Sequence, residues 1–291
     1  GSTECSIANS LWTDPEGRMQ EDFVGRCSGI FDAQVFQEDL SAPVIVPALN
    51  SWVSDHTAGM IPQIIQRPFG EDAAALMVNA LYLKNTWAAK FDPSDTITRD
   101  FTRADGTAEP LDFLQHFSRS LTYLQSGSDE GVLLPYDDGR LAFFALMPRQ
   151  SSGVPDFERW LSSLTGEGLS ALLSGRDETF FLRLSLPKFE QEWSGELKDA
   201  LAALGLTDAF DPDLADFSLL GDDPRGYYLS QVIHAARIEV NEEGTEAAAA
   251  TVVAAASGRP APGGRHSDLR PPLPLWHRGP AERSALVPRH V

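Results

Sequence analysis

The sequence has little that would tie it to a membrane, to nucleic acid or to a disulfide-stabilised fold. Its two cysteines, Cys5 and Cys27, are too few for a disulfide framework or a zinc site, so we expect two buried free thiols. No apolar run approaches the roughly 20 residues of a membrane helix, and no signal peptide is visible. The net charge of -19 argues against nucleic acid and favours a soluble monomer.

Motifs of catalysis are also missing. The sequence has no His-Glu-x-x-His pair, no phosphate-binding loop, no Gly-x-Ser-x-Gly elbow and no dinucleotide-binding glycine pattern. Three of the six histidines, His266, His277 and His290, fall in the last part of the chain. No local pairing of a nucleophile with a base stands out. We therefore predict a protein that is not an enzyme and that uses no cofactor or metal.

The patterns that are present indicate mixed helices and strands. Glu21–Gly29 and Val44–Ile65 carry apolar residues at helical spacing, whereas Ala73–Leu83 is uniformly apolar, as a strand buried on both faces would be. Asp137–Gly139 predicts a tight turn between two strands. Helices and strands do not alternate regularly, so the fold class predicted is α+β with large antiparallel sheets.

The most unusual stretch contains small residues almost without interruption. Gly244, Thr245 and Glu246 precede Ala247–Ala250 and Thr251, and two valines, three alanines and a serine follow. Composition alone favours a helix, because alanine is the best helix former. The alternative is a strand whose side chains are small enough to enter a packed sheet. One face of that strand would hold Thr245, Ala247, Ala249, Thr251, Val253 and Ala255.

Several separated segments resemble the serpin family. The resemblance is carried by Val78–Phe91, Asp105–Thr107, Leu134–Tyr136, Phe143–Pro148, Leu186–Phe189 and, above all, Leu229–Glu246 with the small residues after it. Together they cover residues 3 to about 257. The resemblance implies the serpin fold, with a large mixed or antiparallel sheet A, sheets B and C, surrounding helices and an exposed reactive-centre loop.

The resemblance also implies a function. A serpin is a suicide inhibitor of serine proteases: the protease cuts the loop, is trapped as an acyl-enzyme, and the cut loop inserts into sheet A. The alternative is a non-inhibitory serpin-fold protein with a binding or storage role, or a non-functional truncated product. An extracellular location is expected by resemblance alone.

Individual positions take roles from the same resemblance. Asn79 and His234 match a polar pair where sheet A opens and are expected to hydrogen bond to each other, although a satisfied core histidine is the simpler interpretation of His234. Trp87, Lys188 and Glu242 match the region where insertion begins, with an ion pair between the last two. The hinge comprises Glu242, Gly244, Thr245, Glu246, Ala247, Ala248, Ala249, Ala250 and Thr251. Gly244 is expected to give the backbone freedom to fold over.

The bond that a protease would cut is expected among Ala256, Ser257, Gly258 and Arg259. The usual loop length places the residue before the scissile bond at Gly258. Arg259 would suit a trypsin-like protease, but Pro260 makes that bond a poor substrate. The small residues before Gly258 instead favour an elastase- or subtilisin-like partner.

Both ends depart from the family pattern. Residues 1–258 are interpreted as a partial serpin domain that lacks the first four helices and the first strand of sheet B. Residues 259–291 hold seven prolines and six arginines but two acids, so this tail carries +4 against -23 for the rest. Arg270–His277 and Leu286–Arg289, read one nucleotide later, permit the missing serpin ending. We therefore hypothesise a frameshift between about Gly258 and Asp268, and expect an unstable chain that inhibits poorly.

Overall fold

A computed structural model describes residues 3–15, 19–103, 106–118, 121–127, 129–149, 157–177, 182–222 and 226–257. Its strands are β1 (Glu4–Thr13), β2 (Ala33–Gln37), β3 (Ala73–Thr86), β4 (Ile97–Thr102), β5 (Ala108–Ser118), β6 (Thr122–Ser126), β7 (Asp129–Pro135), β8 (Ala142–Pro148), β9 (Arg176–Asp177), β10 (Leu182–Pro187), β11 (Phe189–Glu196), β12 (Tyr227–Val240) and β13 (Gly244–Ser257). Its helices are α1 (Glu21–Phe31), α2 (Ile45–His56), α3 (Phe157–Ser163), α4 (Gly166–Ser174) and α5 (Lys198–Ala203), with 3-10 turns η1 (Pro93–Asp95) and η2 (Asp208–Phe210).

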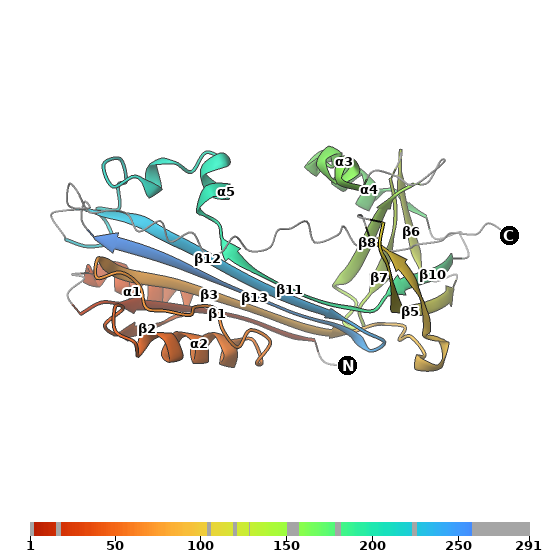
Figure 1. Cartoon of the computed structure of the whole chain (residues 1–291), viewed down its shortest axis with the longest axis horizontal. Coiled ribbons are helices and arrows are strands. Elements are labelled where there is room, and N and C mark those ends of the chain that lie inside the picture. Colours follow the sequence, from red (N-terminus) through yellow and green to blue (C-terminus); the bar gives the residue numbers. More distant parts are fainter. Residues whose placement is uncertain are drawn as a thin grey trace.

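The strands form three sheets. Sheet A has six strands in the order β11-β12-β13-β3-β1-β2, and its neighbours are antiparallel except for the parallel pair β1–β2. Sheet B has the order β8-β7-β6-β9, and sheet C has the order β10-β5-β4. Figure 1 shows the long strands of sheet A running through the molecule toward the two smaller sheets at one end. The predicted α+β class with one large and two smaller sheets is confirmed.

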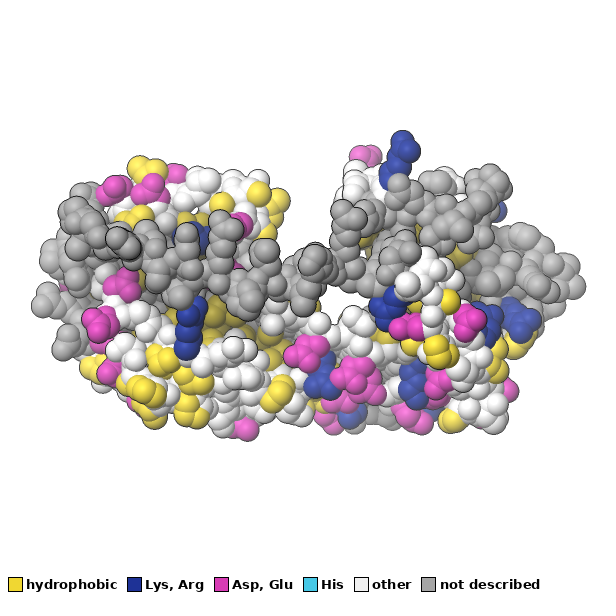
Figure 2. All heavy atoms as spheres, viewed as in Figure 1, with side chains coloured by type: hydrophobic (Ala, Val, Ile, Leu, Met, Phe, Trp, Pro, Cys, Tyr) yellow, Lys and Arg dark blue, Asp and Glu magenta, His cyan; other side chains and the backbone are white. Residues whose placement is uncertain are grey.

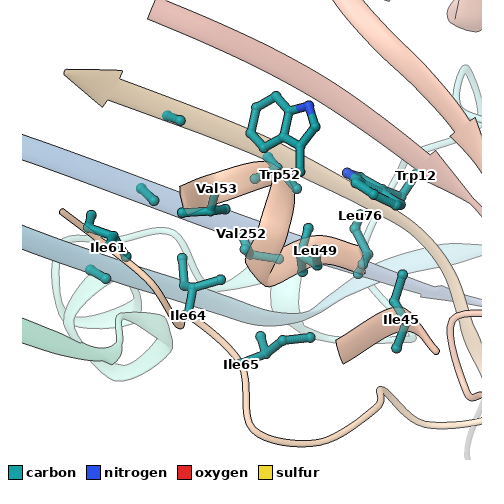
Figure 3. Close-up of a cluster of buried hydrophobic side chains, with 14 of the residues drawn as sticks. Trp12, Ile45, Leu49, Trp52, Val53, Ile61, Ile64, Ile65, Leu76 and Val252 are labelled. Carbon is teal, nitrogen blue, oxygen red and sulfur yellow. The ribbon is translucent and has the colours of Figure 1, made fainter. Parts of the chain in front are cut away.

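Helix α2 covers one face of sheet A. Its apolar side chains, such as Leu49 and Val53, are fully buried against Leu76 of β3 and Val252 of β13. Figure 3 shows these residues packed together, with Trp12 and Trp52 beside them. Removing this much apolar surface from water is the main driving force for holding the sheet and helix together.

The opposite face of sheet A is covered only at its ends in the described part of the chain. Near one end, α1 and the segment around Leu220 form a cluster on it, and α5 and Phe210 form another. At the other end, β12 packs against sheets B and C. Figure 2 shows the molecule hollowed between the part with α5 and the part with α3 and α4. The prediction that Ala73–Leu83 is buried on both faces is therefore wrong in its second half, where Asn79 and Leu81 are exposed.

Two other expectations need correction. The helix predicted over Val44–Ile65 ends at His56, because Ala58 and Gly59 adopt left-handed backbone conformations directly after it. The Asn50 side chain then accepts the backbone N–H groups of Ile64 and Ile65 and holds them in an irregular segment. That segment still buries its isoleucines, which explains the apolar spacing. Both cysteines are free, as predicted, but Cys5 is exposed and Cys27 only half-buried.

Within the described residues, we find no helix with both the length and the apolar character needed to cross a membrane. These residues also contain no cluster of three or more His, Cys, Asp or Glu side chains that could hold a metal ion.

Candidate functional site

The small-residue segment is a strand, and it lies in the middle of sheet A. Gly244–Ser257 forms β13, which is antiparallel to β12 on one side and to β3 on the other. At its centre, Ala250 faces Ala235 of β12 and Ala80 of β3. The helical interpretation of this segment is therefore wrong. The loop expected at the surface also lies inside the sheet instead, where its backbone gains hydrogen-bond partners on both sides.

Small side chains are the physical reason that this strand fits. Ala248, Ala250, Val252 and Ala254 point toward α2 and are almost completely buried, with Ala250 only 1% exposed. The alternating residues from Thr245 to Ala255 share one face of the strand, as predicted. That face points away from α2, and its central residues are only half-buried. The requirement for small residues is thus strictest at the even-numbered positions beneath α2.

A tight turn at residues 241–243 folds β13 back along β12. The Asn241 side chain accepts the backbone N–H groups of Glu243 (3.0 Å) and Gly244 (3.2 Å). Gly244 is outside the left-handed region of backbone conformation, so conformational freedom is not its role here. A Cβ atom at this position would lie 1.9 Å from the carbonyl oxygen of Asn85. Glycine is needed in the inserted strand because β3 approaches so closely.

The residues predicted at the start of insertion surround this turn. Trp87 is buried, donates its indole N–H to the Asn241 carbonyl (2.9 Å) and stacks on Tyr136. The predicted ion pair is present, because Lys188 Nζ lies 2.9 Å from a carboxylate oxygen of Glu242. Burial raises the pKa of Glu242, but hydrogen bonds from Lys188 and Thr96 outweigh it and leave the pKa below its usual value.

Glu246, the only charged residue of β13, contacts β3. Its carboxylate accepts the hydroxyl of Tyr82 (2.8 Å) and pairs with Lys84 Nζ (3.0 Å). The hinge alanines Ala247–Ala250 follow it directly along the strand.

The expected hydrogen bond between Asn79 and His234 is not formed, because β13 separates β3 from β12. Thr251 lies between the two, and its hydroxyl lies 2.7 Å from His234 Nδ1. Asn79 instead donates to the side chain of Asn9 on β1 (2.9 Å). Burial lowers the pKa of His234, which favours the neutral ring. A direct contact between Asn79 and His234 requires β13 to leave the sheet.

The far end of β13 holds the expected cleavage region. Ala256 is fully buried, and Ser257 donates its backbone N–H to the Asp72 carbonyl (2.7 Å). Gly258 and Arg259 lie outside the described residues, as do the tail 259–291 and the segments on which the frameshift hypothesis depends. In this form, the residues up to Ser257 are paired within sheet A, so a protease cannot bind them as an extended segment.

Sequence reasoning missed several partners of the inserted strand. Tyr82 and Lys84 stand two apart in β3, so they share one face and could have been matched to the lone charge of β13. Asn241 carries a turn signal, because an asparagine follows a long strand. Asp72 acts through its backbone carbonyl, and no side-chain pattern could have identified it.

This geometry is typical of proteins in which a long segment of small residues forms a middle strand of a large sheet, as Gly244–Ser257 does here. A family model described as Serpin (serine protease inhibitor) matches residues 1–265. Serpin B10 of Otolemur garnettii is 34% identical over 206 residues, which are 70% of this chain and 51% of that protein. Serine protease inhibitor 42Dd of Drosophila melanogaster is 31% identical over 251 residues, 85% of this chain and 65% of that protein. The chain belongs to the serpin family.

Solved structures agree with this assignment. A thermophilic serpin, tengpin, in the latent state superposes with a TM-score of 0.76 at 30% identity, over 86% of this chain and 67% of that one. Emu ovalbumin (Dromaius novaehollandiae) matches with a TM-score of 0.81 at 23% identity, over 89% of this chain and 67% of that one, which supports the fold alone. The chain spans about half to two thirds of the length of the curated relatives named above.

Proposed function

We propose that the protein to which this chain belongs inhibits serine proteases as a suicide substrate. The observation that carries the proposal is the position of β13, which pairs along its whole length with β12 and β3. Its small side chains show that this segment fits between the two strands, as a cleaved loop entering the sheet must do.

The chemistry begins when the protease serine attacks the carbonyl carbon of the residue before the scissile bond. The peptide C–N bond breaks, the serine proton passes to the departing amine, and an ester joins loop and protease. Insertion of a 14-residue strand then moves the ester by roughly 46 Å at about 3.3 Å per residue. This displacement distorts the catalytic site of the protease before water can release the ester.

We assign the hinge role to Gly244, Thr245 and the alanines after them, which enter the sheet first. The turn contacts of Trp87 and the Lys188–Glu242 pair hold the point at which insertion starts. Asn79 and His234 would close the sheet while the loop is out, and Thr251 occupies the position between them once it is in. An elastase- or subtilisin-like protease with a small primary pocket suits the residues before Gly258. The monomeric state and the extracellular location of the protein stay predictions.

A second candidate function is supported by the same strand. The sequence continues beyond Ser257, yet β13 already lies in sheet A without cleavage. Ala256 is buried there, so the expected cleavage region is not exposed to a protease. In this form the chain is not inhibitory. Its role would be that of a spent or latent form, or of a serpin-fold protein that does not act on proteases.

Incubation with elastase, subtilisin and trypsin tests these two candidates. Suicide inhibition predicts an SDS-stable complex with elastase or subtilisin, a cut mapped by mass spectrometry to residues 256–259, and a sharp rise in the melting temperature of the cleaved protein. An already inserted loop predicts no complex, slow cleavage before Ser257 and no change in melting temperature. A complex that forms with trypsin alone would contradict the proposed protease class.

A further inference from the structure

The inserted strand carries little information about its own register. From Ala247 to Ala250 four alanines follow one another, and three more precede Ser257. A slip of two residues would keep every side chain on its face and would replace alanine by alanine at several positions. Strands of this kind are prone to alternative pairings unless a specific contact fixes one of them.

Glu246 supplies such a contact. Glu246 is the direct pairing partner of Lys84 on β3. One of its carboxylate oxygens lies 3.0 Å from Lys84 Nζ, and the other accepts the hydroxyl of Tyr82 (2.8 Å). Tyr82 is only 6% exposed, so its hydroxyl depends on this acceptor. Both hydrogen-bonded partners of Glu246 are therefore on β3. Strand β12 places the like charge of Glu239 opposite it and the cation of Arg237 one same-face position further along, and Arg237 also lowers the pKa of Glu246.

A strand shifted by one residue, or by two residues toward the turn, would lose this arrangement. A slip of one residue moves Glu246 to the opposite face of sheet A, between Ile238 and Leu83, where no cation faces it. A slip of two residues toward the turn moves it opposite Thr86, whose hydroxyl already donates to Asp137. In either case the Glu246 carboxylate would no longer reach Tyr82, and a buried hydroxyl would lack its acceptor.

The pKa values of the two side chains agree with a stable contact. Burial raises the pKa of Glu246, but hydrogen bonds from Tyr82 and Lys84 outweigh it, and the net pKa lies below its usual value. The hydrogen bond to Glu246 and the charge of its carboxylate raise the pKa of Lys84. Both groups thus stay charged across the physiological range.

We propose that Glu246 is the positioning residue that fixes the register of the inserted strand, through its carboxylate contact with Tyr82 and Lys84. This inference rests on the loop insertion of the proposed function and adds the residue that aligns it. The Thr251–His234 contact, five residues further along β13, is a second alignment point that the test leaves untouched.

Disulfide trapping measures the register directly. With Cys5 and Cys27 replaced by serine, Ala249→Cys with Leu81→Cys reports the observed register, because these two residues are partners on the open face. Ala249→Cys with Leu83→Cys reports the two-residue slip toward the turn, because that slip brings Ala249 to the place of Ala247, which faces Leu83. The two cysteine pairs differ in geometry and therefore in intrinsic oxidation rate. This difference is the same in every variant, so a change in the ratio of the two rates reports a change in register. We expect Glu246→Ala to lower this ratio by roughly tenfold.

The matched control is Glu243→Ala, which removes the same charge from the neighbouring turn, where Glu243 pairs with the half-exposed Lys90. This control is expected to leave the ratio unchanged. Exchange of the two charges, Glu246→Lys with Lys84→Glu, is expected to restore much of the ratio. An unchanged ratio in Glu246→Ala, or an equal fall in Glu243→Ala, would overturn the inference while leaving insertion itself intact. If neither cysteine pair forms a disulfide, even after loop cleavage, β13 is not inserted and both proposals fail.

Discussion

At the scale of single residues, Gly244 shows how closely two strands approach at the start of insertion. Replacement by alanine places a methyl group 1.9 Å from the Asn85 carbonyl oxygen, so β13 and β3 must separate there. We expect Gly244→Ala to lower the free energy of unfolding by about 1–3 kcal/mol, measured by urea denaturation. Gly25→Ala in α1 is the control, because nothing lies within 4 Å of its added Cβ. Equal midpoints for the two variants would contradict the close-approach argument.

His234 predicts a pH dependence. Burial holds its pKa below the ordinary 6.5, so on acidification the unfolded chain takes up the proton before the folded chain does. The stability that depends on the neutral ring is therefore complete above about pH 6.5 and decreases as the pH falls below it. Its neighbours Thr251, Trp193 and Gly195 carry no charge that could offset this effect. Urea midpoints at about pH 7.5 and 5.5 should differ less in His234→Gln than in the parent. An identical difference would contradict this role for His234.

Of the contacts predicted from the sequence, one is present in the structure and one is not. The Lys188–Glu242 ion pair is present as predicted, and Trp87 lies beside the same turn after β12. The predicted Asn79–His234 contact is absent, because β13 lies between β3 and β12. A sequence that is compatible with two states of one loop cannot indicate which state a structure will show.

At the scale of elements, two neighbouring alanines of β13 differ in how deeply they are buried. Ala250 is 1% exposed beneath α2, whereas Ala249 lies on the open face. We expect Ala250→Leu to destabilise the folded chain by about 1–3 kcal/mol, because the added carbons meet a closed core, and Ala249→Leu to change stability by less than about 1 kcal/mol. Urea denaturation of both variants measures the difference. If the two variants are equally destabilised, the packing beneath α2 is not what limits side-chain size.

The elements themselves were predictable where period and turn signals agreed. The helix at Glu21–Phe31 and the turn between β7 and β8 were predicted, because helical spacing and turn residues are clear there. The end of α2 was missed, because isoleucines at helical spacing continue into a segment that the Asn50 side chain holds irregular. The helical alternative for β13 arose from alanine content, which tertiary pairing on both sides overrides.

At the scale of the whole molecule, charge is distributed unevenly over sheet A. The face under α2 carries charged residues near the β12–β13 turn, among them Lys84, Glu239 and Glu246. The middle rows of the opposite face carry none, although the chain has a net charge of -19. These rows consist of Ile238, Ala247, Leu83 and Cys5; Trp193, Ala236, Ala249, Leu81 and Ile7; and His234, Thr251, Asn79 and Asn9. Such a surface is typical of one that packs against another part of a protein.

The size of this uncharged face allows a final prediction. Five strands about 4.8 Å apart and rows about 7 Å apart give an area of several hundred Å², which is the size of the largest exposed patch on a typical monomer. Ile7 is 66% exposed and Leu81 is 39% exposed on it. We expect the chain to bind the dye ANS, and the double change Ile7→Ser with Leu81→Ser to reduce the fluorescence by about half or more. Leu204→Ser with Leu219→Ser removes two isolated exposed leucines elsewhere and should have little effect. Equal losses in both double variants would show that the dye does not select this face, and that the hollow between α5 and α3–α4 is not the main apolar surface of the chain.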